Sequence, residues 1–174
     1  MPSKTVSAFP AWGAVAMILA TAVAAMGFEP MTATVRVSSG QLYDYVVIGE
    51  HPGATDSFDN AYDIISPGNL NADMGDPFIS AVVSHPEWRP AREMRGDTRS
   101  PAKKKQWDVS VTSSLAKGTP LVVSIVPEES RLPKQATIAA KEGNTQVDLT
   151  NNEYILSAPG PGSVARLKIV AEQP

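Results

Sequence analysis

Apolar and polar side chains alternate along most of the chain beyond Pro30, which is the pattern of strands that bury one face. In the run WDVSVT, which begins at Trp107, every second side chain is apolar and the others are Asp, Ser and Thr. Proline interrupts most windows that could form a longer helix after residue 28. The pattern therefore predicts an all-β chain with strands over 32–37, 42–48, 78–83, 107–112, 121–126, 136–140, 145–149, 153–157 and 164–171.

Turn-forming residues separate the predicted strands, for example at 117–120 (KGTP), 142–144 (EGN) and 159–162 (PGPG). Short strands at intervals of about 8–12 residues are typical of an antiparallel sandwich. A chain of 174 residues has room for one domain of ordinary size. We therefore expect one immunoglobulin-like antiparallel β-sandwich of about seven to nine strands over residues 31–174.

The N-terminal segment has the outline of an export signal. Residues 9–28 carry no charge and follow Lys4, and Ala22-Val23-Ala24 forms an A-x-A-like cleavage site. The segment predicts a signal-peptide helix over residues 1–24, cleaved near Ala24. About 20 apolar residues can also span a bilayer, so a retained membrane anchor is the alternative. Either outcome predicts a secreted, extracellular or cell-surface protein, the periplasm included, with membrane contact only if the segment is retained.

Charge and cysteine content exclude several classes of function. The 15 Lys and Arg residues against 18 Asp and Glu residues give a net charge of −3, whereas nucleic-acid binders are usually basic. With no cysteine, disulfide scaffolds, thiol nucleophiles and cysteine-ligated metal sites are excluded. Serines occur without a G-x-S-x-G or S-x-x-K context. We therefore expect neither a nucleic-acid partner nor enzymatic activity.

Two long segments between predicted strands carry opposite charge. Residues 49–84 contain six acidic residues and no Lys or Arg, whereas residues 85–105 contain seven basic residues and three acidic ones. Arginine binds carboxylates through paired hydrogen bonds. We therefore expect the two segments to face each other across one end of the sandwich.

Three carboxylates in the acidic segment form a candidate metal site. Asp56, Asp59 and Asp63 lie within eight residues of one turn-forming stretch, and clustered oxygen ligands suit Ca²⁺. The spacing is not that of an EF-hand, and Asp side chains also cap turns without a metal. Both interpretations stay open here, and no other cofactor is expected.

Trp88 is the candidate ligand-binding residue, because it lies in the loop sequence HPEWRP, where it either packs against one end of the sandwich or faces a ligand. Trp107, in contrast, is in phase with the apolar Val109 and Val111 and is expected in the interior.

Three segments taken together resemble a β-sandwich module of large exported bacterial and archaeal surface proteins. They read GATDSFDNAYDIISPG, HPEWRPAREMRGDTRSP and KKQWDVSVTSSLAKGTPLVVSI, and the resemblance covers about residues 43–171. The matching residues are Gly53, Ala54, Thr55, Asp56, Phe58, Asp59, Tyr62, Asp63, His85, Pro86, Glu87 and Trp88. The resemblance implies a structural or adhesive role at the cell exterior and no assigned catalytic residues.

These observations together predict a non-catalytic exported module that mediates protein–protein assembly. Its partner is expected to be another exported or surface protein or a second copy of itself, bound through a sheet edge or the long loops. The alternative is a carbohydrate-binding module, supported by Ca²⁺, in which Trp88 and one or two tyrosines stack on the sugar.

Overall fold

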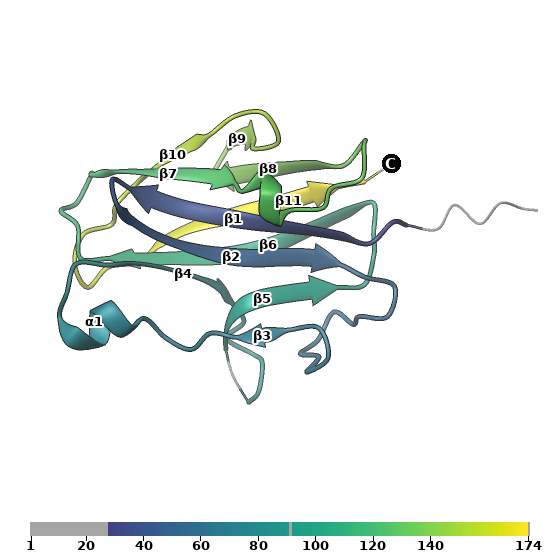
Figure 1. Ribbon diagram of the computed structural model, residues 1–174, viewed down its shortest axis with the longest axis horizontal. Coiled ribbons are helices and arrows are strands. Elements are labelled where there is room, and N and C mark those ends of the chain that lie inside the picture. The colour runs from purple at the N-terminus through teal and green to yellow at the C-terminus, as the bar shows by residue number, and fades with distance from the viewer. Residues whose placement is uncertain (1–27, 91, 174) are drawn as a thin grey trace, which may run out of the picture.

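The computed structural model describes residues 28–90 and 92–173 (Figure 1). Eleven strands form one sheet, accompanied by a short helix and one turn of 3₁₀-helix. The all-β prediction is confirmed. The elements are β1 (Met31–Ser39), β2 (Leu42–Glu50), β3 (Ile64–Ile65), α1 (Leu70–Met74), β4 (Ile79–Ser84), β5 (Glu93–Arg99), β6 (Lys104–Ser113), β7 (Pro120–Ile125), η1 (Pro127–Glu129), β8 (Thr137–Glu142), β9 (Thr145–Asp148), β10 (Tyr154–Ser157) and β11 (Ala165–Glu172).

The strands are hydrogen-bonded in the order β10-β7-β1-β2-β5-β4-β6-β11-β8-β9, with β3 paired to β5. All neighbours are antiparallel except β2 and β5, which run parallel over residues 47–50 and 96–99. The predicted purely antiparallel sheet is therefore wrong at this position, and the eleven strands exceed the predicted number. The parallel pairing is made possible by the long connection between β2 and β5, because a parallel partner needs a crossover of a dozen or more residues.

The sheet curls so that its two halves cover one core. Buried side chains of β1 and β2 join those of β6, β8 and β11 in a single apolar cluster. Figure 1 shows β1 and β2 lying across β6 and β11. Where the curled sheet ends, the Tyr154 hydroxyl of β10 donates a hydrogen bond to the Glu142 carboxylate of β8 at 2.5 Å. The sheet is therefore nearly closed, like a barrel.

All nine predicted strands occur, with boundaries that differ by three residues or fewer. The elements that the alternation missed are β3, α1, β5 and η1, and the first three lie in the segments expected to be loops. Strand β5 reads EMRGDTR and shows little apolar alternation, yet Gly96 and Asp97 on it are buried. Its Arg95, Asp97 and Arg99 side chains are ion-paired, so a strand without an apolar stripe can still be covered.

Trp107 is fully buried at the centre of β6, as predicted from its phase with the neighbouring valines. Burying a large aromatic side chain removes on the order of 150–250 Å² from water and contributes strongly to the core. The indole Nε1 also donates to the Asp97 carbonyl oxygen at 3.2 Å, so its polar atom is satisfied. The ring thereby joins the apolar core to strand β5.

The predicted signal peptide over residues 1–24 lies outside the described residues. Within residues 28–90 and 92–173, no helix has the length and apolar character needed to cross a membrane.

Candidate functional site

A groove of about 780 Å³ lies on the outer face of β4, β6 and β11. It extends to the β8–β9 turn on one side and to the connection before β5 on the other. We call this feature the groove. Its lining residues are Ser80, Val82, Ser84, Pro86, Arg92, Glu93, Asp108, Val109, Ser110, Thr112, Lys141, Glu142, Gly143, Val164, Arg166, Leu167 and Lys168.

The alternation of the three strands explains the floor of the groove. Residues such as Ala81, Val109 and Leu167 point into the core, so their neighbours point outward. On β4 and β6 those neighbours are small, and the Ser84 and Ser110 hydroxyls are hydrogen-bonded to each other at 2.7 Å. Small outward side chains between larger flanking ones leave a depression that a partner can enter.

The groove carries both signs of charge with basic groups in excess. Lys168 lies 3.7 Å from Asp108, and Glu142 accepts the hydrogen bond from Tyr154. Among the residues that the structure describes, the three remaining basic side chains of the groove, Arg92, Lys141 and Arg166, form no ion pair. Glu93 and Glu142 keep their negative charge, because the hydrogen bond that Glu142 accepts comes from a neutral phenol, so the lining has four basic and three acidic side chains. The three unpaired basic side chains suit carboxylates of an occupant.

Trp88 does not lie in the groove. The indole is only 8 % exposed, and the His85 ring is stacked on it with centroids 3.5 Å apart. Phe58 contacts the same indole edge-on, with centroids 6.2 Å apart. Of the two interpretations of the HPEW loop, the structure shows packing, so Trp88 presents no open face on which a sugar could stack. Of the described residues that line the groove, none is aromatic.

The stacked histidine belongs to a buried polar network that the sequence did not reveal. His85 Nε2 lies 2.7 Å from the Asp97 carboxylate, which is fully buried. Arg99 binds the same carboxylate, at 2.8 Å from Nη2. Burial alone would raise the pKa of Asp97, but the hydrogen bonds from His85 and Arg99 and their charges outweigh it and hold the pKa below its ordinary value. The network fixes β5 against the loop that carries Trp88.

The three candidate calcium ligands have separate partners. Asp56 binds the Lys105 ammonium at 2.6 Å and the Ser100 hydroxyl at 2.7 Å. Burial raises the pKa of Asp56, and these hydrogen bonds more than reverse that effect, so the net pKa is lowered. Asp59 instead accepts a hydrogen bond from the Ala61 amide at 3.0 Å, as a turn-capping side chain does.

Asp63 is buried and accepts hydrogen bonds from two backbone amides, Asp59 N at 2.6 Å and Thr98 N at 3.0 Å. Burial raises the pKa of this carboxyl group despite both hydrogen bonds. Asp63 thus anchors the acidic loop to β5. Within the described parts of the chain, no group of three or more His, Asp or Glu side chains is arranged to hold a metal ion.

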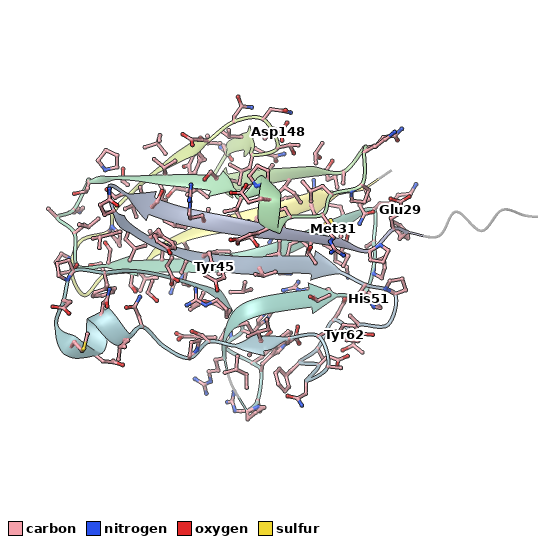
Figure 2. All side chains as sticks on the ribbon, viewed as in Figure 1. Glu29, Met31, Tyr45, His51, Tyr62 and Asp148 are labelled. Carbon is pink, nitrogen blue, oxygen red and sulfur yellow. The ribbon has the colours of Figure 1, made fainter. Side chains whose placement is uncertain are left out.

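A second ring contact stabilises the start of the acidic loop. His51 and Tyr62 have ring centroids 4.8 Å apart, and Figure 2 shows the two side chains at the same end of the molecule. The Gly53 amide donates to His51 Nδ1 at 3.0 Å. A Cβ atom on Gly53 would lie 2.3 Å from the Tyr62 hydroxyl oxygen, so only glycine fits this approach without a shift.

The acidic and basic segments do contact each other, as their charges predicted. The ion pair that joins them is Asp56 with Lys105, a lysine and not an arginine. The arginines bind elsewhere, since Arg95 pairs with Asp44 of β2 and Arg99 pairs with Asp97 of its own strand. The expected arginine pairs between the two segments are therefore wrong in their partners.

The groove was not predicted from the sequence, although the outward positions of Asp108, Ser110 and Arg166 follow from the alternation. The curvature that gathers these positions depends on how β4, β6 and β11 pair, which the alternation does not specify. Comparison of the chain with family models, with characterised proteins and with solved structures finds no match.

Proposed function

We propose that this chain is a non-catalytic structural or adhesive module that acts outside the cytoplasm and joins a protein assembly through the groove. Its partner is another exported or surface protein or a second copy of the chain. The two sheet halves that face one core support an immunoglobulin-like arrangement as part of this proposal.

One observation carries the proposal, which is the chemistry of the groove lining. Its floor offers hydroxyl groups and short apolar side chains, and its walls offer unpaired basic groups and Glu93. Such a surface suits a polypeptide, which brings backbone donors and acceptors together with side chains of mixed kind. A sugar ring would instead favour aromatic faces, and Trp88 is packed away from the groove.

Site-specific photo-crosslinking tests the proposal. A photoreactive phenylalanine analogue replaces Ser110 on the groove floor in the full chain, produced in its native cell. We expect a crosslinked protein species in the envelope or the medium after illumination. The matched control carries the same analogue at Arg36, an exposed position on the outer face of β1, and is expected to give no such species.

Groove variants make the test specific. The double change Lys141→Glu and Arg166→Glu reverses the charge of two lining side chains and is expected to abolish the Ser110 crosslink. Equal crosslinking from Ser110 and Arg36 would contradict the proposal. A native protein that is found only in the cytoplasm would also contradict it.

A further inference from the structure

Helix α1 is an exposed element with an apolar face. Leu70 is 70 % exposed and Met74 is 61 % exposed, and residues four apart lie on the same side of a helix. The structure describes all five residues of α1 and none is buried. Figure 1 shows α1 at one corner of the molecule, outside the layers of strands. Most helices in proteins are stabilised by packing an apolar face, and this one leaves its face uncovered.

The helix is nevertheless fixed in place by its caps. Asn69 accepts a hydrogen bond from the Ala72 amide at 3.2 Å and donates one to the Ile79 carbonyl oxygen at 2.8 Å. Gly75 ends the helix in the left-handed conformation, with φ of 78°. These caps form the helix within the chain itself, which lowers the ordering cost when a partner covers it.

Charge and shape match α1 to the groove. Asp73 lies on α1, Asp76 follows the helix directly after Gly75, and residues 49–84 contain no Lys or Arg. The groove presents the unpaired basic side chains of Arg92, Lys141 and Arg166. A five-residue helix is about 7.5 Å long and about 10 Å wide with its side chains, and a face of three neighbouring strands is about 10–15 Å across. Helix α1 is thus similar in size to the groove, and its carboxylates suit the three unpaired basic side chains of the lining, which also carries Glu93 and Glu142.

We propose that the groove binds helix α1 of a second copy of this chain. Leu70 and Met74 cover Val82 and the small hydroxyl residues of the floor, while Asp73 and Asp76 pair with Lys141 and Arg166. None of the described residues lining the groove belongs to α1 of the same chain, so the contact is made between copies. The proposal deepens the proposed function, on which it rests, by naming the occupant of the groove.

A charge-swap mixing experiment tests the proposal by sedimentation and light scattering of the full chain. Asp73→Lys with Asp76→Lys makes the helix basic, and Lys141→Glu with Arg166→Glu makes the groove acidic. Each variant alone is expected to weaken self-association by roughly tenfold or more, and a mixture of the two variants is expected to restore it. Lys117→Glu with Lys134→Glu, which changes two exposed lysines elsewhere, is the control and is expected to associate like the parent.

A second pair of variants tests the apolar contact. Leu70→Ser with Met74→Ser is expected to weaken self-association, whereas Ile155→Ser, at another exposed apolar residue, is expected to leave it unchanged. Circular dichroism confirms that every variant is folded. A parent chain that stays monomeric at high concentration, or a mixture that does not associate, would overturn the inference. If Ser110 still crosslinks to a different protein in that case, the proposed function stands and only its occupant is wrong.

Discussion

The His85 imidazole lies flat on the Trp88 indole, with ring centroids 3.5 Å apart and planes 6° apart. The same imidazole contacts the buried Asp97 carboxylate through Nε2 at 2.7 Å. One histidine thus connects an apolar contact in a loop to a charged group on β5. In the loop sequence HPEW, His85 therefore links the buried Trp88 to strand β5.

Trp88→Ala is expected to lower the free energy of unfolding by about 3–5 kcal/mol, because it removes a buried aromatic side chain and leaves a cavity between His85 and Phe58. Trp88→Phe keeps one ring in the stack and is expected to cost clearly less. Denaturant unfolding measures both changes. The control is Tyr43→Ala, since Tyr43 is 64 % exposed and its loss is expected to stay within about 0.5 kcal/mol. A stable Trp88→Ala chain that loses binding to a sugar would restore the carbohydrate-binding alternative.

Asp97→Asn is expected to lower the free energy of unfolding by about 3 kcal/mol at neutral pH, because Arg99 and His85 then face a neutral side chain inside the fold. Since the folded state holds the pKa of Asp97 below its ordinary value, its ionisation stabilises the fold above about pH 4. That stability is lost as the pH falls through the folded-state pKa.

The free energy of unfolding, measured across the acid range, tests this predicted loss of stability at low pH. The parent chain is expected to lose stability more steeply below about pH 4 than Asp97→Asn does. Asp108→Asn, at an exposed position, serves as the control for removing a carboxylate. Identical acid profiles for the parent and Asp97→Asn would show that the buried carboxylate does not link folding to pH.

The alternation located nine strands because half-buried strands carry an apolar side chain at every second position. It missed β5 because Gly96 and Thr98, which are in phase with Met94, are not apolar, and because the partners that make the covering of Arg95 and Asp97 acceptable are not visible in the alternation. Asp44 supplies one such partner, 51 residues from Arg95. Parallel strands such as β2 and β5 are not joined by a short turn, so no turn motif in the sequence indicates that they pair.

Site residues were predicted with less success for a related reason. Asp56, Asp59 and Asp63 are close in sequence, but their carboxylates point to Lys105, to Ala61 and to two backbone amides. Closeness along a loop does not fix the direction of a side chain. The groove, in contrast, combines positions from three strands that are far apart in the chain, so only the strand pairing reveals it.

Calcium is expected to leave the melting temperature unchanged, because Asp56 is neutralised by Lys105 and both oxygens of Asp63 accept backbone hydrogen bonds. A ligand that binds the folded state alone would raise the melting temperature with its concentration. Thermal unfolding with excess Ca²⁺ and with EDTA measures the difference. A melting temperature that rises in excess Ca²⁺, and that no longer rises in the Asp59→Ala variant, would instead support the three aspartates as a metal site.

Tyr154→Phe is expected to destabilise the chain by about 1.5–3 kcal/mol at neutral pH, the usual range for a hydrogen bond to a charged group. The lost bond is the one that joins β10 to Glu142 at the end of β8, where the curled sheet nearly closes. Glu142 is exposed and regains water, so the lower end of this range is expected. Tyr43→Phe is the matched control.

The stability at alkaline pH distinguishes the contribution of this hydrogen bond from that of packing by the Tyr154 ring. Burial, together with the hydrogen bond and charge of Glu142, raises the pKa of Tyr154 to about 12. A pKa above that of the unfolded chain, about 10, means that the phenol stabilises the fold fully below pH 10 and loses this contribution as the pH rises through about 12. The parent and Tyr43→Phe should therefore lose stability over that interval, and Tyr154→Phe should lose less. Because the chain has four tyrosines, the difference in tyrosinate absorbance between the parent and Tyr154→Phe during an alkaline titration assigns the ionisation of Tyr154. A Tyr154 that ionises near pH 10 would show that the contact closing the sheet is not formed in solution.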